Sequence, residues 1–339
     1  MAGLRRCLAA LDARPSGSEL IVAADGARED CRRLAAAHGA RVLIIDGPSG
    51  PAVARNAAAA LASGDVLVFV DADVVVSASA LARIPRIFAD RPYTSAVFGA
   101  YDEHPADNGF VSQYKNLSHA YIHRSSAVKA QTFWAGFGAV RRNAFRAVGG
   151  FDERFERPCV EDIDLGYRLT RAGYEVHLDP TLTACHLKRW TLRSTIASDV
   201  WDRGVPWTQL ILRYGAMADD LNLRVGHRWS IVLAYAGLAS IALAAFDARL
   251  ALAALAAAAA LTLVNWRYYG FFYRMRGGSF TARAWLLHAL HHVYNGLSFA
   301  AGATLFVAAR YAGVRLPGAL PVDAWTAAPR PVTTTTRLR

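Results

Sequence analysis

Residues 65–74, DVLVFVDADV, place five consecutive apolar residues between two aspartates. An apolar run of this length, rich in β-branched residues, is typical of a buried parallel strand. In open α/β sheets ligands bind beyond the carboxyl ends of such strands, which is where Asp71 and Asp73 follow. Alternate residues of an extended chain project to the same side, so both carboxylates are placed to approach one divalent cation and a diphosphate. The simpler alternative is an acidic turn in which Asp73 or Ser77 caps the next helix.

The segments around this strand alternate between strand and helix. Apolar runs predict further strands at 19–24, 41–45, 96–101 and 174–178. Helical spacing with capping signals predicts helices at 4–11, 29–38, 51–62, 81–88, 143–148 and 161–172. Short links between alternating elements favour an α/β fold with a mostly parallel, Rossmann-like sheet covered by helices. We expect this domain to comprise residues 1–186.

The second half of the chain has a different composition. Of the 339 residues 54% are hydrophobic and 19% are charged, and the apolar excess begins after Arg228. Residues 229–246 and 250–266 are each about long enough to cross a ~30 Å hydrocarbon layer, so we expect a transmembrane hairpin. Residues 285–309 are a third membrane segment in this interpretation, within a membrane region spanning 229–309. A soluble bundle of Ala-rich helices is the alternative.

Two further segments complete the predicted domain organisation. Residues 187–228 are rich in Trp and Arg, which predicts helices at a membrane surface. Residues 310–339 are interpreted as a tail, partly disordered at Thr333–Thr336. The loop after residue 266 carries four arginines, which favours the cytoplasmic side. No apolar leader follows Met1, so we expect a cytoplasmic catalytic domain on an inner membrane of bacterial type.

Charge and cysteine usage narrow the function classes. The net charge is +11 and comes almost wholly from arginine, which suits phosphates and anionic lipid surfaces. No zinc-finger, RNA-recognition or basic-zipper motif is present, so we expect no nucleic-acid partner. The four cysteines lack paired close spacing, which argues against a structural zinc site or a disulfide framework.

A second acidic cluster opens the predicted helix at 161–172. Glu161, Asp162 and Asp164 lie about ninety residues after Asp73. Carboxylates in a first helical turn also complement the helix dipole, which is a structural explanation for them. In an inverting glycosyl transfer one carboxylate takes the proton of the acceptor hydroxyl, and a divalent cation neutralises the leaving diphosphate. The sequence contains separate candidates for both tasks.

Five short motifs together resemble family 2 glycosyltransferases, which have the GT-A fold. They are Asp25-Gly26, Ala54-Arg55-Asn56, Asp71-Ala72-Asp73, Gly149-Gly150-Phe151-Asp152 and Glu161-Asp162, in the order and approximate spacing of the family. The resemblance covers about residues 4–210. It implies that Asp25, Arg55, Asp71 and Asp73 bind the nucleotide sugar. It also implies that Asp73 and Asp71 hold Mn or Mg, and that Asp162 is the catalytic base, with Glu161 beside it.

The resemblance extends to the acceptor side of the site. His186 is implied as a further metal ligand, and a structural histidine is the alternative. The loop at 134–138 is implied as the acceptor-side wall, so Trp134 and Gly136 are candidate acceptor residues, together with Trp190. Leu187-Lys188-Arg189-Trp190 has Leu where processive synthases have Gln, so we expect a single transfer.

The sequence therefore predicts a metal-dependent, non-processive, inverting glycosyltransferase at a membrane. Its expected partners are a UDP- or GDP-sugar donor and a lipid or lipid-linked acceptor. A catalytically inactive GT-A-like membrane scaffold and a nucleotidyltransferase on a related sheet are the alternatives. The family's first strand has no counterpart in this sequence, and Ala24-Asp25-Gly26-Ala27 replaces its usual Asp-Asp-Gly-Ser. We interpret the missing strand as a truncated start.

Overall fold

The computed structural model describes residues 1–26, 29–45, 47–215, 223–313 and 320. The chain divides into two compact units. Unit 1 contains Met1–Asn108, His123–Arg189 and Leu320, and unit 2 contains Gly109–Ile122 and the described part of Trp190–Ala319. Residues 109–122, which the sequence places inside the first domain, therefore pack in the helical unit. Apart from 310–313 and 320, the predicted tail lies outside the described residues.

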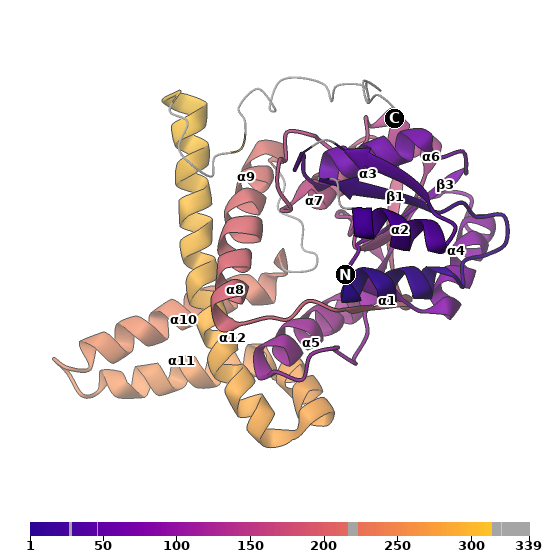
Figure 1. The fold of residues 1–339 in the computed structure, drawn as a ribbon. Helices are drawn as coiled ribbons and strands as arrows, with labels where there is room; N and C mark the ends of the chain where they lie inside the picture. Colours follow the sequence, from indigo (N-terminus) through magenta and orange to yellow (C-terminus); the bar gives the residue numbers. More distant parts are fainter. Residues whose placement is uncertain (27–28, 46, 216–222, 314–319, 321–339) are drawn as a thin grey trace. The chain divides into compact units, whose positions relative to one another are not determined.

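Unit 1 is a mixed α/β domain (Figure 1). Its elements are α1 (Ala2–Leu11), β1 (Ile21–Asp25), α2 (Glu29–Ala37), β2 (Arg41–Ile45), α3 (Pro51–Leu61), β3 (Val66–Val70), β4 (Val74–Val76), α4 (Ala78–Asp90), β5 (Thr94–Tyr101), β6 (Lys129–Ala130), β7 (Phe137–Arg141), α6 (Arg142–Ala147), α7 (Glu161–Arg171) and β8 (Glu175–His186). Strands β1 and β2 pair in parallel, and the larger sheet has the order β3-β7-β5-β8-β4, with β6 beside β8.

The predicted α/β class is confirmed, but the sheet is mixed instead of mostly parallel. In the larger sheet only the β5–β8 pairing among the described strands is parallel, and the pairings β3–β7, β5–β7, β4–β8 and β6–β8 are antiparallel. The residues before β6 and β7 explain this, because α5 (Phe110–Ser125) packs in unit 2 through Ile122 and supplies no crossover helix to the sheet. Strand β3, predicted to be buried and parallel, is antiparallel to β7 and leaves Val68 42% exposed.

The core of unit 1 lies between α4 and the middle of the sheet. Every residue of β5 is buried, which explains its nearly continuous apolar sequence. Helix α4 begins at Ser77, whose Oγ accepts a hydrogen bond from Ala80 N at 3.2 Å. Its buried residues Leu81, Ile84 and Phe88 repeat at helical spacing and belong to the same apolar cluster as Val97 of β5. This packing fixes the end of β3, which Asp71 follows, and the start of β4, which Asp73 precedes.

Unit 2 is helical. It contains most of α5 together with α8 (Leu192–Ala197), the π-helical segment η1 (Ser198–Gly204), α9 (Val205–Tyr214), α10 (Val225–Leu243), α11 (Leu250–Val264) and α12 (Trp266–Tyr311). Helix α12 breaks at Gly277, where φ is 79° and ψ is −178°, a backbone conformation that favours glycine. The arginine-bearing loop predicted after residue 266 is thus helical on both sides of this break. Of the tryptophans expected at a surface, Trp201 is 50% exposed and Trp207 is buried.

The predicted membrane segments correspond to α10, α11 and the second part of α12. Helices α10 and α11 pack against each other as a hairpin (Figure 1). With 15 residues, α11 spans about 22 Å at 1.5 Å per residue, which is shorter than a ~30 Å hydrocarbon layer. Among the described residues no single helix combines the length and hydropathy needed to cross a membrane. Helices α11 and α12, which meet at a 72° bend, satisfy the length and hydropathy requirements when they are taken together.

Candidate active site

Arg55 of α3 connects the two acidic motifs. Its Nη2 donates a hydrogen bond to Asp71 Oδ1 at 2.7 Å, and its Nη1 donates one to Glu161 Oε1 at 2.8 Å. The Arg55 side chain is 16% exposed. Burial lowers the pKa of Arg55, but the neighbouring carboxylates Asp71 and Glu161 outweigh this and raise it above its usual value. The guanidinium is therefore a fixed positive charge between the carboxyl end of β3 and the start of α7.

Asn56, next to Arg55, holds the glycine-rich turn that precedes α7. Its Nδ2 donates to Phe151 O, and its Oδ1 accepts from Phe151 N, both at 2.8 Å. The Phe151 ring lies under Arg55, with the guanidinium carbon 5.4 Å from the ring centroid. The sequence motif included Asn56 but gave it no role. Its reciprocal pair of hydrogen bonds ties the part of α3 that carries Arg55 to the Gly149–Asp152 motif.

The catalytic candidates Glu161 and Asp162 have different surroundings. The Glu161 side chain is 5% exposed, and its Oε2 accepts from Cys159 N at 2.8 Å while Oε1 accepts from Arg55. Both of its oxygens are thus engaged inside the protein, which suits a positioning role. Asp162 is only half-buried; its Oδ2 accepts from Ala135 N at 3.1 Å, and its Oδ1 accepts from Ile163 N at 2.8 Å. Because Asp162 is the less buried of the two, it is the better placed to receive a proton from a substrate.

The loop at 134–136 brings Asp162 and Asp71 to the same place. Ala135 N donates a hydrogen bond to the Asp162 carboxylate. The carbonyl oxygen of the next residue, Gly136, accepts a hydrogen bond from Asp71 N at 3.2 Å. A Cβ at Gly136 would lie 2.4 Å from Nε1 of the Trp134 indole, so only glycine lets the indole fold back over the loop. The structure thus brings together the β3 end, the α7 start and the predicted acceptor-side loop. Trp190 belongs to unit 2, where Lys115 Nζ lies 5.7 Å from its ring centroid.

Asp73 and His186 form the second pair of the site. The β4–β8 register places Val74 opposite His186, and His186 Nε2 lies 3.4 Å from Asp73 Oδ2. Burial raises the pKa of Asp73, but the hydrogen bond and charge of His186, with a further contribution from Lys188, outweigh it and hold the pKa below its usual range. Asp73 remains 45% exposed, so its carboxylate is ionised and accessible at neutral pH.

Tyr101, at the end of β5, is a site residue that the sequence interpretation missed. Its ring stacks on His186 with centroids 5.3 Å apart and an interplanar angle of 14°. The Trp134 ring also meets the Tyr101 ring edge-on, with the two centroids 4.8 Å apart. The signal was available, since Tyr101 ends a mostly apolar strand at the same sheet edge as the aspartates. These three rings link the acceptor-side loop to the Asp73–His186 pair.

Asp25 supports the site from β1. Its carboxylate accepts from Ser49 N at 2.7 Å and from Gly50 N at 2.9 Å, immediately before α3. Gly50 has φ 89°, and a Cβ there would lie 2.5 Å from Glu156 O. Asp25 thus fixes the start of the helix that carries Arg55. The predicted contact of Asp25 with a nucleoside stays a prediction.

The donor atoms at Asp73 and His186 fit a partial shell for a divalent cation. A carboxylate oxygen and an imidazole nitrogen are 3.4 Å apart, and one oxygen of Asp71 is already bonded to Arg55. Within the described parts of the chain, no group of three or more His, Cys, Asp or Glu side chains is arranged to hold a metal ion. Mg²⁺ sites in nucleotide-binding proteins commonly use one or two carboxylates and take their other ligands from phosphates and water. The residues present fit a cation that is shared with a diphosphate.

Comparison with known proteins identifies the family. Residues 2–149 match the model for glycosyl transferase family 2. Residues 2–149 are therefore a glycosyl transferase family 2 domain. Residues 115–187 also match the model described as the N-terminal domain of galactosyltransferase. The predicted family and its GT-A fold are thereby confirmed.

The family 2 domain has several named relatives. The succinoglycan biosynthesis protein ExoA of Rhizobium meliloti is 31% identical over 176 residues, which are 48% of this chain and 52% of that protein. The pre-mycofactocin glycosyltransferase of Mycobacterium tuberculosis is 30% identical over 58% of this chain and 42% of its own. The O-antigen chain rhamnosyltransferase WbaN of Salmonella anatum is 26% identical over 57% and 65%, respectively. The chain thus spans about half the length of the curated relatives it matches.

Solved structures with a similar backbone include two with bound ligands. The mannosyltransferase PcManGT from Pyrobaculum calidifontis, in complex with GDP-Man and Mn²⁺, is 16% identical with a TM-score of 0.46, over 94% of this chain and 74% of that one. Glucosyl-3-phosphoglycerate synthase from Mycobacterium tuberculosis, with Mn²⁺ and UDP, is 18% identical with a TM-score of 0.43, over 63% and 76%.

Proposed function

We propose that this protein transfers a sugar, with inversion and in single steps, from a nucleotide-sugar donor to a lipid or lipid-linked acceptor at a membrane. The observation that carries the proposal is the joint anchoring of Asp71 and Asp162 by the Ala135–Gly136 loop, with Arg55 bridging Asp71 and Glu161. Such a group combines a fixed cation, a nucleotide-side carboxylate and an accessible base within one unit.

Asp162 is assigned as the general base. The acceptor hydroxyl oxygen forms the new bond to the anomeric carbon, while the bond from that carbon to the diphosphate oxygen breaks on the opposite face. Asp162 takes the hydroxyl proton as the new bond forms, a role worth ~10²–10⁴-fold in rate. The backbone N–H of Ala135 holds one of its oxygens, which fixes the direction in which the carboxylate faces. Glu161 acts by positioning Arg55, since its side chain is buried and accepts a hydrogen bond from the guanidinium.

The donor is held by groups around β1, α3 and β3. Arg55 remains protonated at all physiological pH values and so supplies a positive charge. Asp71 bonds Arg55 through one oxygen, and its other oxygen takes no part in that hydrogen bond. Asp73 and His186, with Asp71 beside them, would hold Mn or Mg. When bound, such a cation neutralises the negative charge that develops on the departing nucleoside diphosphate. The panel of UDP- and GDP-sugars described below distinguishes the two candidate nucleotides.

The lipid acceptor is proposed from the helical unit and from relatives. Large apolar side chains of the α10–α11 hairpin stay exposed, among them Ile241 at 63%, Leu252 at 69% and Leu263 at 70%. Exposed apolar surface on this scale is typical of a membrane or partner contact. One relative is named for succinoglycan biosynthesis and another for O-antigen chain rhamnosyl transfer. We propose attachment to a bacterial-type inner membrane with the family 2 domain in the cytoplasm.

The test uses the full chain in detergent micelles with Mn²⁺, a panel of UDP- and GDP-sugars and a total membrane lipid extract as acceptor. We expect release of one nucleoside diphosphate that depends on the lipid extract, together with a sugar-bearing product in the lipid phase. Nucleoside diphosphate release that needs no acceptor would point to hydrolysis instead of transfer. Consumption of none of the donors would contradict the proposed activity.

A further inference from the structure

The first part of α12, which runs from Trp266 to the break at Gly277, has two different faces. Seven residues make about two turns of an α-helix, so positions seven apart share a face. Trp266 and Tyr273 form such a pair, and they are 62% and 64% exposed. Arg267 and Arg274 form a second pair directly beside the first, and both are exposed. We call these four residues the Trp–Arg face.

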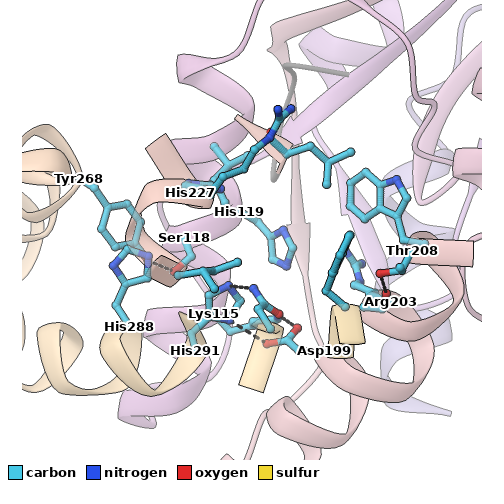
Figure 2. Close-up of a pocket in the computed structure, with 18 of the residues that line it drawn as sticks. Lys115, Ser118, His119, Asp199, Arg203, Thr208, His227, Tyr268, His288 and His291 are labelled. Carbon is cyan, nitrogen blue, oxygen red and sulfur yellow. Dashed lines mark hydrogen bonds and ion pairs between the residues drawn. The ribbon is translucent and has the colours of Figure 1, made fainter. Parts of the chain in front are cut away.

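The opposite face of the same segment is packed against α5. Tyr268 and Phe272 are buried in one apolar cluster with Tyr114 and Leu117 of α5. Figure 2 shows Ser118 of α5 beside Tyr268, and their hydroxyl oxygens are 2.7 Å apart. This packing and the hydrogen bond hold the helix at one rotation about its axis. The Trp–Arg face is therefore directed away from the core of unit 2.

The charge on the Trp–Arg face is positive. Residues 248–322 contain seven arginines and no aspartate or glutamate. In the parts of the chain that the structure describes, Arg267 and Arg274 form no ion pair with a carboxylate. Burial raises the pKa of the Tyr121 phenol of α5, and the charges of Arg224 and of these two arginines oppose that rise. The two arginines thus lie close enough together to act on one phenol.

The Trp–Arg face adjoins the exposed apolar surface of the α10–α11 hairpin. Leu263 and Val264, the last residues of α11, are 70% and 45% exposed, and Trp229 near the start of α10 is 59% exposed. A Cβ at Gly226 would lie 3.8 Å from Val264 Cγ1, so the start of α10 lies beside the end of α11. Helix α12 then leaves α11 at a 72° bend. The Trp–Arg face therefore lies at the base of the hairpin.

We propose that the Trp–Arg face binds the phosphate groups of anionic phospholipids where the α10–α11 hairpin enters a lipid layer. Trp and Tyr prefer the membrane–water interface because their rings have an apolar body and a polar group. Guanidinium groups pair with phosphate oxygens. An arginine near an anionic membrane surface adds about fivefold in affinity, which corresponds to ~1 kcal/mol. An acidic protein would complement the arginines but would leave the adjoining apolar hairpin uncovered.

This assignment rests on the proposed membrane attachment and names the class of lipid. The test uses the full chain reconstituted in phosphatidylcholine vesicles that contain a trace of spin-labelled lipid. Electron paramagnetic resonance measures how strongly labelled phosphatidylglycerol and labelled phosphatidylcholine associate with the protein. We expect phosphatidylglycerol to associate at least about fivefold more strongly at low salt. The preference should fall in about 1 M NaCl, because salt screens exposed charges.

Three outcomes overturn the proposal. Equal association of the two lipids does so, and if polyglutamate binds the same protein, it indicates an acidic protein partner instead. A preference that salt leaves unchanged excludes the exposed arginines as its cause. A chain that does not float with vesicles of either lipid overturns the membrane attachment together with this site. UDP and GDP binding, measured in parallel, reports on the family 2 domain, so failure of the donor site is distinguishable from failure of the lipid site.

Variants connect the lipid preference to the Trp–Arg face. Arg267→Gln combined with Arg274→Gln should lower the preference for phosphatidylglycerol at least about fivefold. Both positions are exposed, so the variant should stay folded. Arg267→Lys combined with Arg274→Lys keeps the charges and should retain most of the preference. Arg33→Gln removes an exposed arginine of α2 in unit 1 and is the matched control. An unchanged preference in the double Gln variant overturns the proposal.

Discussion

Arg55 and Glu161 are joined by a 2.8 Å hydrogen bond across 106 positions of the sequence, and the other arm of the same guanidinium holds Asp71 at 2.7 Å. The bridge determines the geometry of the candidate active site. It ties the end of β3 to the start of α7, so a substitution in one acidic motif should also shift the side chains of the other. The predictions below separate residues that hold this geometry from residues that carry out the chemistry.

Replacing Arg55 should damage both the fold and the activity. Arg55→Gln leaves the Glu161 carboxylate buried without its cation, and breaking such a pair costs ~3–5 kcal/mol. Arg55→Lys should lie between wild type and Arg55→Gln, because one ammonium group does not reproduce the fork that meets two carboxylates. Urea unfolding of the full chain in micelles measures the loss of stability. A separate assay of nucleoside diphosphate release by the folded protein measures the loss of activity. Arg146→Gln, at an exposed position of α6, is the control and should change stability by less than ~0.5 kcal/mol.

Replacing Asp162 should remove turnover while leaving the protein folded. Asp162→Asn keeps the shape of the side chain but lacks the base, so kcat should fall by ~10²–10⁴-fold with nucleotide binding unchanged. Asp164→Asn, two residues further along α7, provides the contrast. Asp164 is fully buried and accepts from Arg168 Nε at 2.7 Å, so this variant should lose stability instead. Full turnover in a folded Asp162→Asn protein would assign the base to another residue.

Removal of divalent cations should stop the reaction reversibly. EDTA should abolish nucleoside diphosphate release, and added Mn²⁺ should restore it, because Asp73 and His186 offer only part of a coordination shell. Asp73→Asn and His186→Gln should each raise the Mn²⁺ concentration needed by more than ~10-fold. Electron paramagnetic resonance of Mn²⁺ in the presence of UDP or GDP measures binding independently of turnover. His177→Gln changes a histidine on the same strand that bonds Thr94, and it should leave Mn²⁺ affinity unaltered.

The contribution of Asp152 to stability should depend on pH. Asp152 accepts from Arg154 Nε at 2.8 Å and from Arg154 Nη2 at 2.6 Å. Burial raises the pKa of Asp152, but Arg154 and the charge of Arg168 outweigh it and hold the pKa below its usual value. A depressed carboxyl pKa adds stability above the unfolded value of about 3.9, and this stability is lost as the pH falls through the lower folded value.

Wild type should therefore exceed Asp152→Asn in free energy of unfolding by ~1–2 kcal/mol at neutral pH. The difference should shrink as the pH falls below about 4, the unfolded pKa of the carboxyl group. Urea unfolding at neutral pH and at several acidic values checks this. Asp65→Asn serves as the control, because the Asp65 side chain is 99% exposed and should show no such dependence. A difference that grows on acidification would reverse the assigned sign.

Much of the local structure was predictable from the sequence. The helices at α3, α4 and α7 begin within three residues of their predicted starts, because their apolar spacing and terminal signals are encoded locally. The order of the motifs also indicated the family that residues 2–149 match. Strand direction was predicted wrongly because it depends on where intervening helices pack, and α5 packs in unit 2. The role of Tyr101 was missed because stacking on His186 joins two strands far apart in sequence.

The sequence by itself determined the class of fold, the family and the residue types available for catalysis, since these follow from composition, periodicity and motif order. Only the tertiary structure decided that Arg55 bridges Asp71 and Glu161 and that His186 lies beside Asp73. The physical reason is that hydrogen bonds and ion pairs act over a few ångströms. Which distant residues come within that range is set by the packing of whole helices and strands.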